Sequence, residues 1–146
     1  MPNITHYLVI NAPAETVYKA VTEEAGLASW WAKNTIAKPE VGFTDEFIFG
    51  DSSKNYKGEG RHHNKMLVTE LVPNTLARWD CKGGDPEWIG TRLSFEMTPG
   101  EGKTELMFTH ADWAAQTQFF ANCNYFWGMF MTSLKQYCET GTGTPY

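Results

Sequence analysis

The sequence predicts an α+β fold in which a curved antiparallel sheet wraps around a long C-terminal helix, with two short helices after the first strand. Three observations predict this arrangement. Short segments of alternating apolar and polar residues follow one another from residue 34 to residue 110. Residues 116–139 instead carry apolar side chains at the helical spacing of three and four. Two shorter segments with helical spacing separate the first alternating segment from the others.

The N-terminal part begins with a strand and continues with the two short helices. Residues 4–11, ITHYLVIN, alternate and contain several β-branched residues, which is typical of a strand. The first helix covers residues 12–21, because Pro13 suits a first helical turn and the apolar residues after it recur at helical spacing. Thr22 is the expected N-cap of the second helix, which has two glutamates in its first turn.

Five further strands follow, and glycine and proline residues separate them. Their sequences are FTDEFIFG, NKMLVTEL, TLARWDCK, TRLSFEMT and KTELMFTH. Turns are expected at Pro39, Gly42, Gly50–Asp51, Pro73–Asn74, Gly83–Gly84 and Pro99–Gly100. Residues 65–71 do not alternate cleanly, so their faces stay unassigned. Two other strands predict a dry face of the sheet that contains Ala77, Trp79, Cys81, Leu93, Phe95 and Met97.

A long amphipathic helix over residues 116–139 follows the strands. Burial of its apolar stripe stabilises the fold by roughly 15–25 kcal/mol before entropy is counted, so the helix must lie on the dry face of the sheet. Gly141 is the expected C-terminal stop, and the tail after it is expected to be loose unless Tyr146 pins it. The stripe consists of Phe119, Phe120, Cys123, Phe126, Trp127, Phe130, Leu134, Tyr137 and Cys138.

Length and composition predict a single domain over residues 1–146 and exclude several classes of partner. The net charge is −5 and the basic residues are scattered, which argues against nucleic acid and anionic membranes as partners. The N-terminus lacks a signal-peptide pattern, and no run of apolar residues is long enough to span a membrane. Cys81, Cys123 and Cys138 form no paired motif, so reduced thiols in the cytoplasm are the simplest interpretation.

Aromatic side chains are numerous enough to line a cavity as well as to fill a core. The chain has six Trp, six Tyr and nine Phe, and both the dry face and the helical stripe are rich in rings. Such surfaces suit a flat or apolar ligand, although a plain core position is the commoner role of any single tryptophan. The predicted ligand-binding residues are Trp31, Trp79, Phe95, Phe108, His110, Trp113, Cys123 and Trp127.

His110 is the candidate for chemistry. In ELMFTHADW, residues 105–113, it follows Leu106 and Phe108 on the same face of a strand. Four roles are open to it: a catalytic acid–base group, a metal ligand, a pocket wall, or a buried histidine bonded to backbone or water. The last role is the commonest. A nucleophilic pair of Cys123 with His110 lacks a local signature, and no spacing of histidines and cysteines predicts a metal site, so no metal or other cofactor is expected.

Six stretches of the chain carry a resemblance to a known family. They are INAPAETVYKAVTEEAGLASWW, EFIFG, VTELVPNTLARWDC, EWIGTRLSFEMTP, TELMFTHADW and SLKQYCETGTGTP. The sequence thereby resembles the standalone bacterial domains related to the activator of Hsp90 ATPase, within the SRPBCC (START-like, helix-grip) superfamily. This resemblance implies the helix-grip fold and a hydrophobic cavity between the sheet and the C-terminal helix. It does not imply one reaction, because the superfamily includes lipid carriers, hormone receptors, aromatase/cyclases and co-chaperone domains.

Three functions stay open at this point. The preferred hypothesis is a binding domain for a small apolar or aromatic molecule, with His110 and either Asn122 or Tyr125 orienting a polar end of the ligand. The second is an enzyme of the cyclase/aromatase or hydrolase type that uses His110 as a proton shuttle; this is not favoured. The third is a protein-interaction module, either chaperone-linked or a homodimer, which requires an exposed apolar patch.

Overall fold

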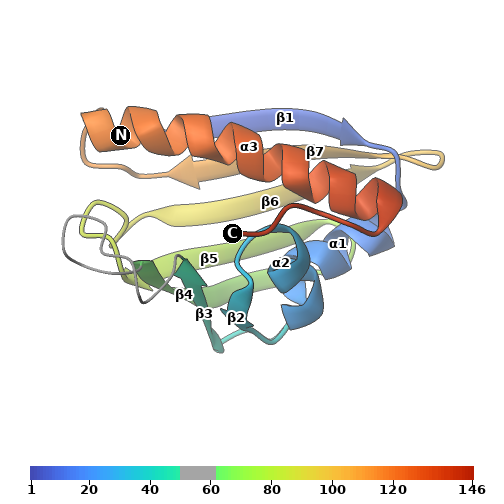
Figure 1. Cartoon of the computed structure of the whole chain (residues 1–146), viewed down its shortest axis with the longest axis horizontal. Helices are drawn as coiled ribbons and strands as arrows, with labels where there is room; N and C mark the ends of the chain where they lie inside the picture. Colours follow the sequence, from blue (N-terminus) through green and yellow to red (C-terminus); the bar gives the residue numbers. More distant parts are fainter. Residues whose placement is uncertain (50–61) are drawn as a thin grey trace.

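The computed structural model describes residues 1–49 and 62–146, and these residues form the predicted α+β fold (Figure 1). The turn predicted at Gly50–Asp51 lies outside the described residues. The elements in chain order are β1 (Ile4–Ile10), α1 (Ala14–Thr22), α2 (Glu24–Trp30), β2 (Asn34–Ile36), β3 (Thr44–Phe49), β4 (His62–Val72), β5 (Leu76–Gly83), β6 (Arg92–Pro99), β7 (Thr104–Ala111) and α3 (Gln118–Thr140).

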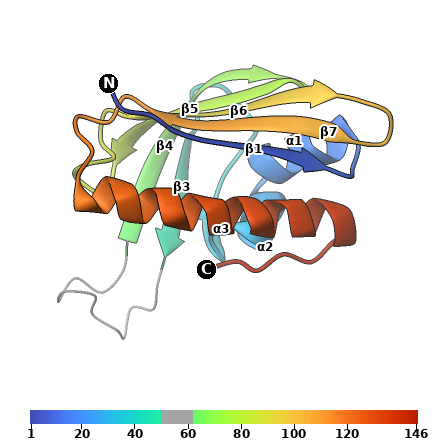
Figure 2. The ribbon, with the colours of Figure 1, turned by 90° about the horizontal axis from the view of Figure 1, so that it is seen from above.

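The strands of the described part form one seven-stranded sheet with the order β1-β7-β6-β5-β4-β3-β2. Every neighbouring pair is antiparallel, as the short turns between the strands predict. Helix α3 runs along one face of the curved sheet, and α1 and α2 cover the same side beside the C-terminal half of α3 (Figure 2). The predicted sheet wrapped around a long C-terminal helix is therefore confirmed.

Two details of the N-terminal half differ from the sequence analysis. Thr22 does not cap the second helix, because it is the last residue of α1 and its Oγ1 donates a hydrogen bond to the carbonyl of Tyr18 at 2.7 Å. Glu23 takes the N-cap position of α2 instead. The sequence analysis does not predict the short edge strand β2, which pairs with β3, because three residues are too few to show alternation.

The irregular alternation of residues 65–71 has a structural cause. The pairing of β4 with β5 shifts register between Lys65 and Met66 and again between Val68 and Glu70. The first shift places an extra residue in β5, and the second leaves Thr69 as an extra residue in β4, which interrupts the period of two in that strand. The predicted dry face on β5 and β6 is confirmed, because Ala77, Trp79, Cys81, Leu93, Phe95 and Met97 are all buried.

Helix α3 begins and ends with clear capping residues. Oγ1 of Thr117 accepts a hydrogen bond from the backbone N–H of Phe120 at 3.1 Å. Gly141 adopts the left-handed conformation, with φ 87°, which confirms it as the C-terminal stop. The tail then returns along the molecule: the backbone N–H of Tyr146 donates to the carbonyl of Trp31 at 2.8 Å. The tail is therefore pinned at Tyr146.

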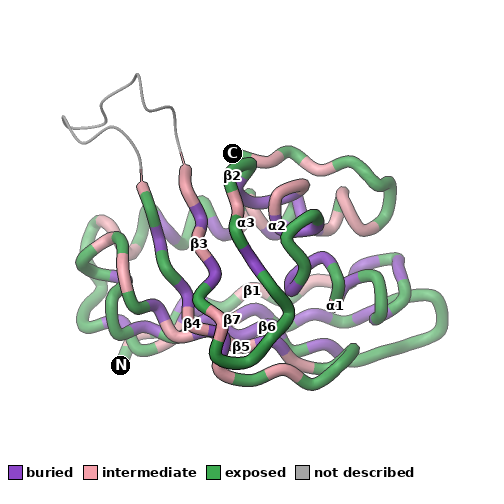
Figure 3. The backbone as a smooth tube through the Cα atoms, turned by 90° about the horizontal axis from the view of Figure 1, so that it is seen from below, coloured by how far each residue is buried: buried purple, intermediate pink, exposed green. Residues whose placement is uncertain are grey.

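The space between the sheet and the helices is filled mainly by aromatic side chains. Figure 3 shows the buried positions in purple along the strands and on the inner sides of the helices. Trp31 lies at the centre, and its ring centroid is 4.4 Å from that of Phe47, 5.2 Å from Trp127 and 6.0 Å from Trp79. Edge-to-face and offset contacts of this kind add to the stabilisation that burial provides. The middle of the sheet–helix interface is thus a packed core.

Candidate ligand-binding pocket

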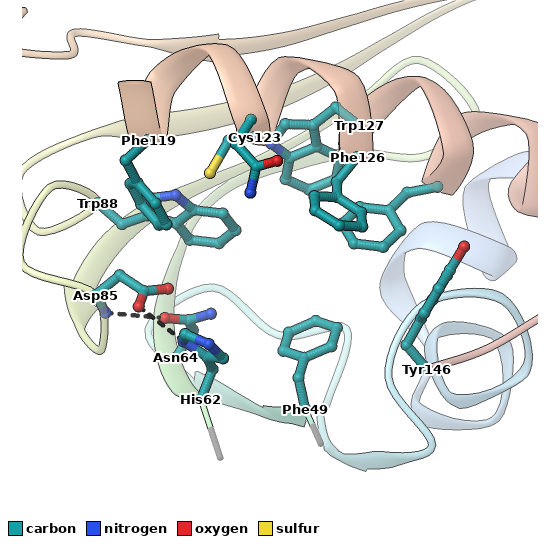
Figure 4. A pocket seen from close by; sticks show the side chains of 12 residues that line it. Phe49, His62, Asn64, Asp85, Trp88, Phe119, Cys123, Phe126, Trp127 and Tyr146 are labelled. Atoms are coloured by element: carbon teal, nitrogen blue, oxygen red, sulfur yellow. Dashed lines mark hydrogen bonds and ion pairs between the residues drawn. The ribbon is translucent and has the colours of Figure 1, made fainter. Parts of the chain in front are cut away.

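An open pocket of about 630 Å³ lies between α3 and the ends of β3 and β4 (Figure 4). Its volume falls in the range of small-molecule sites. The N-terminal half of α3 forms one wall, because the helix turns one side of its apolar stripe toward the pocket and another toward the sheet. The residues that α3 contributes are Phe119, Asn122, Cys123, Phe126, Trp127 and Phe130.

The opposite wall comes from four separate segments of the chain. Phe49 ends β3, His62 and Asn64 begin β4, and Tyr146 belongs to the returning tail. Asp85 and Trp88 lie between β5 and β6 and complete the lining. Figure 4 shows the rings of α3 facing Phe49 and Tyr146 across the open space, whereas Asp85, Asn64 and His62 gather at one end. The pocket therefore has a long apolar part and one polar end.

Hydrogen bonds hold the polar end in place. Nδ1 of His62 lies 2.8 Å from Oδ1 of Asp85, and the backbone N–H of Asp85 donates to Oδ1 of Asn64 at 3.2 Å. Gly84 makes this close approach possible: its φ is +115°, and a Cβ there would lie 2.0 Å from Oδ1 of Asn64. The side chain of Asn64 faces inward although it is polar, because it binds the loop that carries Asp85.

Two stacked tryptophans form the inner wall, and His110 fixes them from behind. The rings of Trp88 and Trp127 are 5.9 Å apart with planes 17° from parallel. Nε1–H of Trp127 donates to Nδ1 of His110 at 3.1 Å, so the histidine carries its proton on Nε2, which lies 2.8 Å from Oγ1 of Thr91. That hydroxyl in turn donates to the carbonyl of Trp88 at 2.5 Å. The chain of bonds joins the indole of Trp127 to the backbone of Trp88, and the ring of His110 meets the ring of Trp88 edge-to-face at 4.8 Å.

His110 itself is sealed from water. Its exposed fraction is 0%, and burial lowers its pKa to about 3, so the ring is neutral at physiological pH. Both ring nitrogens bond to uncharged side chains, Thr91 and Trp127, rather than to a carboxylate. The structure therefore buries His110 and gives both of its ring nitrogens side-chain partners.

The thiols are poor nucleophiles in this structure. Burial raises the pKa of Cys123 to about 11, an effect that the neighbouring Trp88 indole partly opposes. Burial likewise raises the pKa of Cys81 to about 11 and that of Cys138 to about 12. Protonated thiols are weak nucleophiles, and Nε2 of His110 is directed to Thr91, so Cys123 and His110 do not form a pair.

The pocket brings together two of the eight residues predicted to bind a ligand, Cys123 and Trp127. The other six lie behind its wall in the packed core, each with an exposed fraction of 1% or less: Trp31, Trp79, Phe95, Phe108, His110 and Trp113. The sequence analysis did not identify the polar end. One signal was present, since Asn64 is a polar residue two positions before Met66 on the inward side of a strand.

Two further properties concern the described part of the chain. Within residues 1–49 and 62–146, no group of three or more His, Cys, Asp and Glu side chains is arranged to hold a metal ion. None of the helices in these ranges is both long enough and apolar enough to cross a membrane.

Comparisons with known proteins agree with the fold. The family model described as Activator of Hsp90 ATPase homolog 1-like protein matches residues 11–139. The Aha1 dimer from Colwellia psychrerythraea, solved in solution, is 35% identical, with 98% of this chain and 100% of that chain covered and a TM-score of 0.82. A Staphylococcus saprophyticus protein is 17% identical, with 98% and 96% covered and a TM-score of 0.75.

A third solved structure is DynU16, from the dynemicin biosynthetic locus. It is 22% identical, with a TM-score of 0.77, and the match covers 99% of this chain but 49% of DynU16. At this identity the likeness shows a shared fold alone. The search of curated proteins gave no match. The family model spans most of the sequence and the Colwellia protein matches it along its whole length, so the chain belongs to the Activator of Hsp90 ATPase homolog 1-like family.

Proposed function

We propose that this chain binds a small, flat apolar or aromatic molecule in the pocket beside α3. The observation that carries the proposal is the lining: seven of its twelve residues are aromatic, and they surround an open volume of about 630 Å³. Family membership supports the proposal because the SRPBCC superfamily that the sequence resembles includes many carriers of apolar ligands.

The exposure of these rings gives a ligand its driving force. Phe126 is 37% exposed, and Phe119 and Phe130 are only partly buried, although all three belong to the apolar stripe of α3. Each Å² of apolar surface that a ligand removes from water stabilises the complex by about 25 cal/mol before the entropy of association is counted. Among the predicted residues, Cys123 and Trp127 would contact the ligand, while His110 would hold Trp127 and Trp88 in position.

The test is a binding screen with a variant that fills the pocket. Asn122 lines the pocket but is exposed, so Asn122→Trp should occupy the space without disturbing the core. Ala121→Trp is the matched control, because Ala121 is an exposed neighbour on α3 that does not line the pocket. We expect a lipid and aromatic panel to raise the melting temperature of the wild type and of Ala121→Trp, but not of Asn122→Trp. The proposal is wrong if no ligand shifts the indole NMR signals of Trp88 and Trp127.

The enzymatic alternative receives no support from the geometry of His110, because both ring nitrogens already bond to Thr91 and Trp127 inside the core. The chaperone-linked alternative rests on the family name. The cytoplasmic location that the cysteines predict likewise stays a proposal.

A second copy of the chain is the protein partner we propose. The Colwellia psychrerythraea relative, which matches along its whole length, was solved as a dimer. On α3, the exposed apolar side chains of Tyr125 and Met129 lie one helical turn apart, outside the pocket, with exposed fractions of 68% and 38%. We infer that this surface of α3 packs against a second copy.

Light scattering combined with gel filtration tests the dimer. The double variant Tyr125→Ser, Met129→Ser should be monomeric at micromolar concentration, where the wild type should be dimeric. Val41→Ser, which removes an exposed apolar residue from a loop away from α3, is the control and should leave the dimer intact. A monomeric wild type, or a double variant with the mass of a dimer, would refute the proposed interface.

A further inference from the structure

We propose that the pocket prefers ligands in which a positively charged amine is attached to the aromatic body, and that Asp85 binds the amine. This inference rests on the proposed function and adds the charge of the ligand to it. Three features of the pocket support it: the carboxylate at the polar end, the rings around that carboxylate and the negative potential at the pocket wall.

The carboxylate of Asp85 has one oxygen left for a ligand. Oδ1 lies 2.8 Å from Nδ1 of His62, whereas Oδ2 accepts no hydrogen bond from any residue in the ranges 1–49 and 62–146. The side chain is only 18% exposed, and Figure 4 shows it directed into the pocket. Nδ1–H of His62 is the donor in this bond, because a carboxylate oxygen only accepts. An ammonium group is a strong donor to such an oxygen.

The position of this oxygen is fixed before any ligand arrives. The backbone N–H of Asp85 donates to Asn64, whose side chain is buried in β4, and Gly84 permits the close approach of the two segments. A carboxylate held in this way loses little conformational entropy when it binds a cation, which favours affinity.

The aromatic residues favour a cation in the same place. The ring of Trp88 lies next to Asp85 at this end of the pocket, and the ring of Phe49 lies on the other side of His62 and Asn64 (Figure 4). The face of an indole or phenyl ring attracts an ammonium group through its negative electrostatic potential. The aromatic body of the ligand would then extend toward Phe126 and Phe130.

Negative potential also reaches the helix side of the pocket. Asp85 and Glu87 both add to the rise in the pKa of the Cys123 thiol, after the larger effect of burial. Cys123 belongs to the opposite wall, so the field of these carboxylates crosses the pocket. A ligand that ends in a carboxylate would be repelled by the same field.

The experiment compares three ligands with one aromatic body. 2-Naphthylmethylamine, 2-naphthylmethanol and 2-naphthylacetate provide a cation, a neutral group and an anion on the same ring system. Their affinities are measured by tryptophan fluorescence and calorimetry at neutral pH and low ionic strength, since salt screens the effect. The proteins are the wild type, Asp85→Asn, and Glu96→Gln as a control that removes one exposed acid from β6 outside the pocket.

We expect the wild type and Glu96→Gln to bind the amine about tenfold more tightly than the alcohol, and the acid most weakly. In Asp85→Asn the advantage of the amine should fall to roughly twofold, because only the attraction of the rings for the cation remains, while the affinity for the alcohol is unchanged. If the alcohol binds but the amine has no advantage in the wild type, or if the full advantage survives in Asp85→Asn, the inference is overturned and the proposed function stands. If none of the three ligands binds, both fail.

Discussion

Asp45 is a buried carboxylate with an unsatisfied oxygen. It lies on the inner side of β3 with an exposed fraction of 1%; Oδ1 accepts a hydrogen bond from the backbone N–H of Lys38 at 3.2 Å, and Oδ2 has no partner in the described part of the chain. Burial raises the pKa of Asp45 to about 7; the Lys38 N–H opposes this rise, and the negative charge of Glu24 adds to it. The folded protein therefore holds a proton that the unfolded chain releases near pH 4.

This shift predicts that the contribution of Asp45 to stability falls as the pH rises from about 4 to about 7. In that interval the unfolded chain has released the proton of Asp45 and the folded chain still binds it, so this contribution to the free energy of unfolding decreases. Asp45→Asn removes the effect, and its free energy of unfolding relative to the wild type should increase by about 2–4 kcal/mol across the interval. Urea denaturation at several pH values measures this. Asp80→Asn, which alters an exposed ion pair with Arg92, should show no such trend.

His110 predicts the opposite dependence on pH. Its pKa in the folded protein is lowered to about 3 by burial, whereas the unfolded chain binds a proton near pH 6.5. The contribution of His110 to stability therefore decreases as the pH falls, by about 2–3 kcal/mol between pH 6.5 and 4.5. His110→Gln keeps a donor and an acceptor for Thr91 and Trp127 but cannot be protonated in this range. It should be less stable than the wild type at neutral pH but should not share the loss of stability at low pH, so the difference between the two proteins should shrink as the pH falls from about 6.5 to about 4.5. Parallel pH curves for the wild type and the variant would contradict the assignment.

At the scale of the element, the segment between β5 and β6 builds the polar end of the pocket. It must pass close enough to β4 for the backbone of Asp85 to bond to Asn64, and Gly84 is the residue in contact. Gly90 belongs to the same segment and also has positive φ, +92°, but nothing lies within 4 Å of a Cβ added there. Substitutions at the two glycines therefore separate the cost of an unfavourable backbone conformation, which both positions share, from the cost of a steric clash, which only Gly84 has.

Gly84→Ala should lower the free energy of unfolding by about 3 kcal/mol, because it adds a clash with Asn64 to an unfavourable backbone conformation. Gly90→Ala should cost about 1 kcal/mol, from the backbone conformation alone. Chemical denaturation gives both values. Equal costs would show that the segment moves away from Asn64 without penalty, and the position of Asp85 would then not be fixed.

The elements themselves were largely predictable from local patterns. Alternation identified β5, β6 and β7, and helical spacing together with Gly141 identified α3. Periodicity could not say which part of the stripe on α3 meets the sheet. Trp127, Met131 and Leu134 are buried against it, whereas Phe126 faces the pocket, although the hydrophobicity of Phe126 is no lower. That division depends on how far the sheet extends, which is a tertiary property.

At the scale of the whole molecule, Ser133 joins three distant segments. Its Oγ donates to the carbonyl of Trp30 at the end of α2 and accepts from the backbone N–H of Thr144, both at 2.8 Å. Ser133→Ala should leave both backbone groups unpaired, destabilise the protein by about 1–2 kcal/mol and accelerate hydrogen exchange at Tyr146 by roughly tenfold. Ser29→Ala removes a hydroxyl that bonds within α2 to Ala25 and should not alter exchange at Tyr146. An unchanged rate in Ser133→Ala would mean that the tail is held elsewhere.

The location of the site depends on how the layers of the whole molecule pack together, so it could not be predicted from the sequence. The sequence predicts a gap between sheet and helix and assigns its lining to rings on the two inner faces. In the structure Trp31, the residue that follows α2, enters that gap and fills its centre, and the open pocket lies toward the start of α3. Whether rings meet one another or face solvent depends on the separation of the layers, which the pattern of one chain does not encode.

The position of Tyr146 has a practical consequence for the design of expression vectors. Its backbone bonds to Trp31 and Lys33, and its ring stands over Phe130 in the wall of the pocket, with centroids 4.9 Å apart. A purification tag fused after Tyr146 would emerge beside the pocket and would compete with the proposed ligand. A cleavable tag placed before Met1 avoids this interference, and screening data from the two fusions should differ.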